Sequence, residues 1–116
     1  INASAYRILI NDSSVEEATR AAEAVIQASE LVIVRPKDQK EADIRPGILR
    51  IEMIESEKGS ELEALLVTGD QQAVRFPELV RGLNAMGLPN EAMLDFWREA
   101  NYIRVNGICR SPLELE

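Results

Sequence analysis

The sequence has no histidine and a single cysteine, Cys109. Without histidine, a histidine general base, a Ser-His-Asp triad and the common zinc sites are excluded. One cysteine can neither form an internal disulfide nor supply the three or four thiolates of an iron–sulfur cluster. The usual enzyme signatures are therefore missing, and nothing in the cysteine content indicates an oxidising compartment.

Long apolar runs and glycine-rich loops are also missing. No run approaches the roughly 20 residues of a membrane helix, and the N-terminus does not read as a signal peptide. The six glycines are scattered singly, so there is no Walker loop and no dinucleotide fingerprint. With 13 Lys+Arg against 20 Asp+Glu, the net charge of −7 repels a phosphate backbone at long range. We expect a soluble, cytoplasmic protein with no membrane partner, and not a general nucleic-acid binder.

The length bounds the domain organisation. At 116 residues and 46% hydrophobic content, the chain is long enough to bury one core. We therefore expect residues 1–116 to form a single domain. Because the chain begins at Ile1 and ends in Leu115-Glu116, a pair that purification tags leave, we also expect it to be excised from a larger protein.

The first third of the chain predicts a strand followed by a helix. Residues 6–10 are rich in β-formers, and four cap-forming residues follow them. A serine at 13 or 14 with glutamate three positions later fits a capping box. Apolar residues recur at helical spacing as far as about Ala28. The apolar run 31–34 then predicts a central strand, joined to the first in parallel by a right-handed crossover.

The middle of the chain predicts a hairpin. Residues 48–55 and 62–66 both alternate between apolar and polar side chains, and turn residues 57–60 separate them. The alternation places three residues of the first strand on the core face: Leu49, Ile51 and Met53.

The last third predicts two helices and a second hairpin. Pro77 opens a helix that Gly87 ends. Residues 88–90 cap another helix, which carries Phe96 and Trp97. Asn106-Gly107 is a strong hairpin turn. The expected fold class is therefore α+β: a two-layer, mixed but mostly antiparallel sheet with helices packed on one face, ferredoxin-like with an extra C-terminal hairpin.

Polar residues of two regions allow a functional and a structural interpretation. Asp43 and Arg45, two apart before Pro46, can hold an anion or activate a nucleophile, but such pairs more often brace a turn through backbone hydrogen bonds. Five glutamates in or beside the hairpin form either a cation-binding wall or, as the alternation favours, a solvated face: Glu52, Glu55, Glu57, Glu61 and Glu63.

Cys109 reads as a small hydrophobe or a reactive thiol. Trp97 reads as part of the core rim or as a binding platform.

Five cations gather in residues 35–50 of this otherwise acidic chain: Arg35, Lys37, Lys40, Arg45 and Arg50. The segment is either a solvated loop or a docking surface for phosphate or an acidic partner. If it binds, Arg35, Lys37 and Lys40 are the strongest candidates, because we see no packing role for them.

Three segments carry a family resemblance: Ala5-Tyr6-Arg7-Ile8, Lys40-Glu41-Ala42-Asp43-Ile44-Arg45-Pro46 and Arg75-Phe76-Pro77-Glu78-Leu79. Together, over roughly residues 5–84, the chain resembles the C-terminal half of the radical-SAM-linked domain family of unknown function. The resemblance implies a domain fused to, or encoded beside, a radical SAM enzyme. S-adenosylmethionine and an iron–sulfur cluster are then expected in that other part, with no cofactor in this chain. The resemblance adds Arg75 to the candidate binding residues.

Family members tend to be encoded near ribosome and RNA-processing functions, so the resemblance also implies RNA or a ribosomal component as substrate. Our first functional hypothesis is a non-catalytic accessory or substrate-recognition domain that works with a radical SAM domain in cis or in trans. The alternative is a stand-alone protein-interaction or dimerisation module using Trp97 or an exposed hairpin edge. An enzyme using Asp43, Arg45 and nearby carboxylates stays open. We expect no metal site.

Overall fold

The computed structural model describes residues 2–35, 38–69, 72–105 and 108–110, with side chains as far as residue 99. Its main sheet has five strands in the order β4-β5-β1-β6-β7, and every neighbouring pair is antiparallel. The strands are β1 (Asn2–Ile10), β4 (Ile48–Ser56), β5 (Gly59–Thr68), β6 (Met93–Val105) and β7 (Ile108–Arg110).

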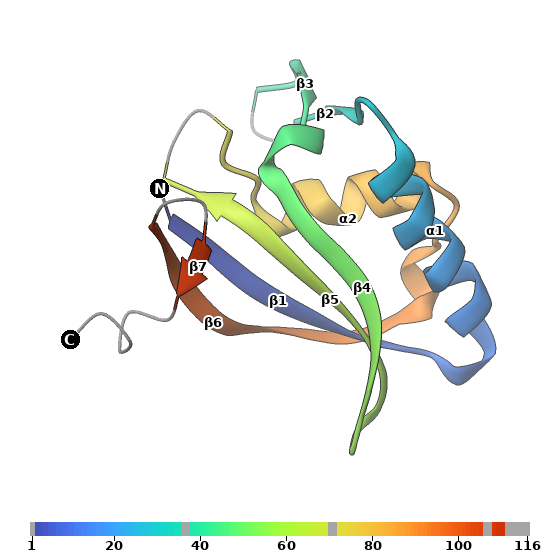
Figure 1. Ribbon diagram of the computed structural model, residues 1–116. Coiled ribbons are helices and arrows are strands. Elements are labelled where there is room, and N and C mark those ends of the chain that lie inside the picture. Colours follow the sequence, from blue (N-terminus) through green and yellow to red (C-terminus); the bar gives the residue numbers. More distant parts are fainter. Residues whose placement is uncertain (1, 36–37, 70–71, 106–107, 111–116) are drawn as a thin grey trace.

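Two helices, α1 (Val15–Gln27) and α2 (Phe76–Ala85), lie on one face of this sheet (Figure 1). The order β1-α1-β4-β5-α2-β6 with this strand arrangement is the ferredoxin-like split βαβ pattern. Beyond it, β6 and β7 form the C-terminal hairpin, with Val105 opposite Ile108. The predicted α+β fold class is therefore confirmed. Residues 106–107 of the predicted turn lie outside the described residues.

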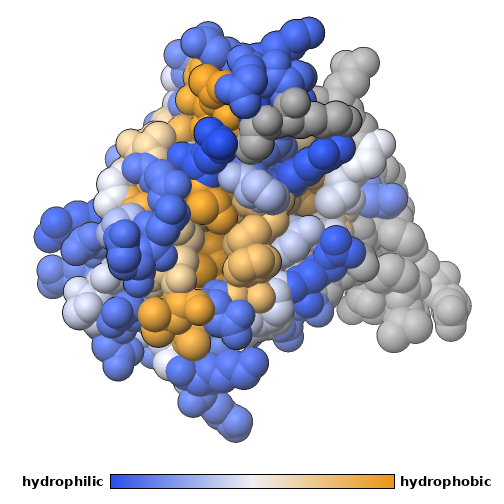
Figure 2. All heavy atoms as spheres, turned by 180° about the vertical axis from the view of Figure 1, so that it is seen from behind, coloured by the Kyte–Doolittle hydropathy of each residue, from blue (hydrophilic) through white to orange (hydrophobic). Residues whose placement is uncertain are grey.

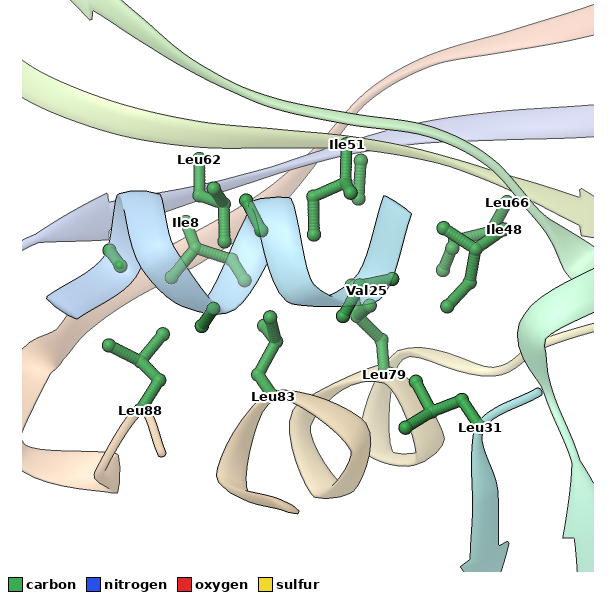
Figure 3. Close-up of a cluster of buried hydrophobic side chains, with 14 of the residues drawn as sticks. Ile8, Val25, Leu31, Ile48, Ile51, Leu62, Leu66, Leu79, Leu83 and Leu88 are labelled. Atoms are coloured by element: carbon green, nitrogen blue, oxygen red, sulfur yellow. The ribbon is translucent and has the colours of Figure 1, made fainter. Parts of the chain in front are cut away.

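The core lies between the sheet and the two helices that cover one of its faces (Figure 3). Ala18, Ala21 and Ala22 are buried on α1, and their small side chains allow the helix to approach the sheet closely. Large aliphatic side chains from the strands and from α2 fill the remaining space, among them Ile8 and Leu83. Each fully buried Leu or Ile contributes about 1.5–3 kcal/mol to folding, so this layer dominates stability.

The helix α1 begins differently from the prediction. A 3₁₀ turn, η1 (Asp12–Ser14), precedes it, and Asn11 caps that turn by accepting a 3.2 Å hydrogen bond from the backbone N–H of Ser13. Ser14 stands at the N-cap of α1 but makes no side-chain capping bond. The predicted capping box is therefore wrong, because the 3₁₀ turn moves the capping role back to Asn11.

The predicted central parallel strand is also wrong. Residues 32–34 form β2 (Val32–Val34), which pairs with β3 (Glu41–Asp43) in a separate antiparallel two-stranded sheet. Strand β1 has no edge left for β2, since β5 occupies one side and β6 the other. In the main sheet β5 separates β1 from β4, the strand that runs parallel to it.

The hairpin β4–β5 is confirmed, but Leu49 lies on the opposite face of the sheet from the one predicted. The register shifts between Ile48 and Arg50, so a bulge sits at this end of β4. Ile51 and Met53 contact the main core as predicted, whereas Leu49 packs against Ala3, Ala5 and Leu65 on the other face of the sheet.

The first C-terminal helix is confirmed as α2, and Gly87 follows it with a φ of +101°, which favours glycine. The second predicted helix, after residues 88–90, is wrong. After a short 3₁₀ turn, η3 (Asn90–Ala92), the chain enters β6, which takes the free edge of β1. Phe96 pairs with Ile8 and Trp97 with Arg7. Because side chains alternate along a strand, Phe96 lies on the helix-covered face and Trp97 on the open face.

Candidate functional site

Three aromatic side chains from distant parts of the chain meet beside the first turn of α2. We call Tyr6, Phe76 and Phe96 the aromatic ridge. The rings of Phe76 and Phe96 stack, with centroids 4.2 Å apart and planes at 18°. The ring of Tyr6 lies 5.3 Å from that of Phe76, tilted by 38°. Phe96 is nevertheless 58% exposed, so the face of its ring that Phe76 does not cover is open to solvent.

Two hollows flank this ridge and share Phe76 and Pro77 in their lining. The first, of about 830 Å³, extends from Tyr6 to the end of β5 at Thr68. The second, of about 500 Å³, follows α2 toward η3. The face turned away in Figure 1 shows orange groups of hydrophobic side chains interrupting a largely hydrophilic surface (Figure 2). An apolar hollow with a few polar groups is the usual form of a ligand site.

Arginines are the only charged residues among the described ones that line the hollows. Arg75 and Arg98 line the first, and Arg81 lines the second. All three are exposed. The Arg98 guanidinium lies over the Tyr6 ring, 5.6 Å from its centroid, in a cation–π arrangement. Within the part of the chain whose side chains are described, Arg75, Arg81 and Arg98 have no ion-pair partner. We call the ridge and these arginines together the arginine–aromatic surface.

A buried carboxylate positions the start of α2 beneath this surface. Glu78 accepts a 2.8 Å hydrogen bond from the backbone N–H of Arg75, the N-cap residue, and so satisfies a backbone donor that the helix leaves unpaired. Its other oxygen lies 2.9 Å from Nε of Arg35. The residue that follows β2 is thereby tied to the first turn of α2. Arg35, a predicted binding residue, has a structural partner.

Asp43 and Arg45 brace the segment around β3, as their structural interpretation predicts. Oδ1 of Asp43 accepts hydrogen bonds from the backbone N–H groups of Leu31, at 2.8 Å, and Arg45, at 3.0 Å. The Arg45 guanidinium donates to the carbonyl oxygens of Ile48 and Ile26, at 2.8 and 3.1 Å. These contacts join the end of α1 to the start of β4.

The basic segment 35–50 does not form one surface. Lys40 is exposed, and Lys37 lies outside the described residues. Arg50 projects from β4 and pairs with Glu63 and Glu52 at N–O distances of 2.7 and 3.7 Å. Of the predicted binding residues that the structure describes, Arg75 is the one that lines a hollow of the arginine–aromatic surface.

The open face of the sheet carries a charge network that the solvated-face prediction misses. Glu61 is 1% exposed and Glu63 is also buried. Nη1 of Arg7 lies 3.2 Å from the Glu61 carboxylate, and Nη2 lies 3.0 Å from the Glu63 carboxylate. The Ser56 hydroxyl donates to Glu61. Burial alone lowers the pKa of Arg7, but the hydrogen bond to Glu61 and the charge of Glu63 outweigh it and leave that pKa raised. The prediction is right for Glu52, which is exposed, as are Glu55 and Glu57.

Trp97 lies at the edge of the same open face, away from the arginine–aromatic surface. Its Nε1–H donates to Glu99 at 2.7 Å, and the Lys58 ammonium lies 4.1 Å from the ring centroid. The indole is therefore engaged by two neighbours. The side chain of Cys109 lies outside the described residues.

Sequence reasoning missed Tyr6, Arg81, Phe96 and Arg98. One signal was available for two of the ridge aromatics: an arginine of the surface lies within two positions of each, as in Arg75-Phe76 and Phe96-Trp97-Arg98. That spacing does not reveal that the three segments meet in space.

The fold and the surface define a ferredoxin-like α+β domain with an arginine–aromatic surface at one edge of its helix-covered face. The family model of uncharacterised proteins conserved in bacteria, DUF2344, matches residues 1–76, and the chain belongs to this family. No curated protein and no solved structure matches the chain. Within the described residues, no helix combines the length and apolar character needed to cross a membrane.

Proposed function

We propose that this domain is a non-catalytic substrate-recognition domain of a radical SAM-associated protein and that it binds RNA through the arginine–aromatic surface. The association with a radical SAM enzyme rests on the sequence resemblance described above. One cysteine does not fit the ligand set of an iron–sulfur cluster, so the cluster and S-adenosylmethionine belong to the associated part. The partner is a radical SAM domain, and the substrate is RNA or an RNA-containing ribosomal component.

The observation that supports RNA is the combination, in an acidic chain, of an exposed aromatic ring with guanidinium groups that form no ion pair with any described side chain. Arginine binds phosphate through planar, bidentate hydrogen bonds. Aromatic side chains stack on bases. Both groups occur here around Phe76, and no described acidic residue lines the hollows on either side. The local charge of Arg75, Arg81 and Arg98 thus opposes the repulsion expected from the net charge of −7.

The test is a titration of a structured RNA with the 116-residue chain at several salt concentrations. A variant with Arg75→Gln and Arg98→Gln is compared with the unchanged protein. If both guanidiniums contact phosphate, the variant binds more weakly and its slope of log affinity against log salt falls by about 1.4 for single-stranded segments and about 1.8 for duplex ones. Arg20→Gln is the control, because Arg20 is exposed on α1, outside both hollows. Equal affinities and slopes in all three proteins contradict the proposal.

The binding role of the basic segment stays a prediction for Lys37 and Lys40. Arg35 is unsuitable for a charge reversal, since a glutamate there faces Glu78. The variant Lys37→Glu/Lys40→Glu in the same titration therefore tests the segment. An unchanged salt slope contradicts a role in binding.

One observation favours the alternative of a protein-interaction or dimerisation module. Leu94, two residues before Phe96 on β6, is also 58% exposed. Exposed large apolar side chains close together mark contact surfaces. Light scattering discriminates the two functions: RNA recognition predicts a monomer at high concentration, whereas a dimer that Leu94→Ser dissociates supports the alternative.

A further inference from the structure

We infer that the arginine–aromatic surface takes single-stranded RNA, with one unpaired base stacked on the open face of Phe96 and neighbouring phosphates held by Arg75 and Arg98. This inference rests on the proposed function and specifies the form of RNA that the surface accepts.

The geometry of Phe96 supports a stacked base. One face of its ring lies on Phe76, with centroids 4.2 Å apart, and the side chain is still 58% exposed. The opposite face is therefore open to a second planar ring. A phenyl ring has no hydrogen-bonding group, so it can stack on any base and reads no sequence. In a duplex, neighbouring bases cover both faces of each base, whereas single strands can turn bases outward.

The arginines lie where the backbone of such a strand would pass. Arg98 is two residues from Phe96 on β6, so their backbone positions are about 7 Å apart. This spacing is comparable to that between successive nucleotides of an extended RNA strand. Arg98 reaches over Tyr6, which touches Phe76, so one series of contacts runs from the guanidinium to the stacked rings. Arg75 lies next to Phe76 and lines the same hollow.

The size and lining of the hollows fit nucleotides. The hollow beside Arg75 and Arg98 is a wide-open depression of about 830 Å³, a form that suits a strand lying along the surface. The hollow on the other side of Phe76 measures about 500 Å³ and has Arg81 as the charged residue of its described lining. Successive nucleotides can thus occupy both sides of the ridge. An acidic peptide would satisfy the arginines but would have no need of an open ring face.

The experiment compares one fluorescently labelled RNA strand of about 12 nucleotides with the same strand annealed to its complement. The unchanged 116-residue chain should prefer the single strand. Phe96→Leu, which keeps an apolar side chain on the strand, should weaken single-strand binding about tenfold, as expected when one base loses its stacking partner. Its duplex binding should not change. Ile26→Ala is the control, because Ile26 on α1 is 50% exposed and lines neither hollow.

Four results overturn the inference, and they separate it from the proposed function. Equal affinity for both RNA forms overturns the stacking mode. A Phe96→Leu variant that binds like the unchanged protein overturns it as well. In both cases the proposed function still stands if RNA binding depends on the arginines. Displacement of the RNA by polyglutamate of the same charge assigns the surface to an acidic peptide instead. No binding of either RNA overturns both. Circular dichroism melting of each variant confirms that the compared proteins are folded.

Discussion

Glu78 and Arg35 connect the small β2–β3 sheet to α2, with Oε2 of Glu78 2.9 Å from Nε of Arg35. The same carboxylate is buried and accepts the backbone N–H of Arg75. Only the glutamate of this pair is buried, so the main effect of removing it is that the backbone N–H of Arg75 loses its acceptor. Glu78→Ala should therefore lower the free energy of unfolding by about 1–3 kcal/mol, as measured by urea denaturation. Glu23→Ala, an exposed change on α1, is the control and should cost less than about 0.5 kcal/mol.

Gly47 and Gly82 should respond differently to alanine. A Cβ atom at Gly47 would lie 2.1 Å from the backbone oxygen of Gln72, which cannot move aside cheaply. At Gly82 the nearest atoms are the side-chain ends of Leu31 and Ile44, at 2.9 and 3.1 Å. In α2 an alanine also gains about 1 kcal/mol of helix propensity.

Gly47→Ala should therefore destabilise the protein by about 3 kcal/mol or more, and Gly82→Ala should be nearly neutral. Thermal melts of the two variants make the comparison. A melting temperature for Gly82→Ala as low as that for Gly47→Ala would contradict this account of the packing.

Arg7 neutralises two buried carboxylates on the open face of the sheet. Arg7→Met should lower the free energy of unfolding by about 3–5 kcal/mol, and adding Glu61→Gln should restore part of the loss. Because the pKa of Arg7 is raised above its usual value, the contribution of Arg7 to stability is fully present below that usual pKa and is lost only as the pH rises through the raised one. Urea denaturation at pH 7 and pH 9 should therefore give the same cost for Arg7→Met. A double variant no more stable than Arg7→Met alone contradicts the pairing.

Much of this fold follows from local patterns, and the errors share one physical cause. Alternation predicts β4 and β5 because each strand buries one face against the helices. Residues 93–100 also fit a helical period, and only the free edge of β1, a partner distant in the sequence, makes them a strand. Likewise, β2 is excluded from the main sheet because β5 and β6 occupy both edges of β1.

The candidate site shows the same limit. The turn-bracing interpretation of Asp43 and Arg45 is confirmed for their local bonds, in which Asp43 accepts from the backbone of Arg45 and Arg45 donates to the carbonyl oxygen of Ile48. Their bonds to the distant backbone groups of Leu31 and Ile26 were not predicted. The aromatic ridge instead requires Tyr6, Phe76 and Phe96 to meet across three elements, which no local pattern encodes. Because the sequence pattern assigned Phe96 to a helix, its position beside Phe76 was not predicted.

Asp43 should stabilise the β2–β3 sheet locally. Its carboxylate accepts the backbone N–H groups of Leu31 and Arg45, and a hydrogen bond to a charged group contributes about 1.5–3 kcal/mol. Asp43→Ala should therefore speed amide hydrogen exchange at Leu31 and Arg45 at least tenfold. The amides of β1 and β5 serve as internal controls. Unchanged exchange at Leu31 would show that the carboxylate does not hold this segment.

The most direct test of RNA recognition is a titration of the isotopically labelled 116-residue chain with single-stranded RNA, followed by amide chemical shifts. The account predicts that the largest shifts cluster around the arginine–aromatic surface, at Tyr6, Gly69, Phe76, Phe96 and Arg98. The amides of Glu52 and Glu61, whose side chains lie on the opposite, open face of the sheet and line neither hollow, should keep their chemical shifts. Largest shifts on that open face or on β2–β3, or no shifts at an RNA excess, would contradict the central claim.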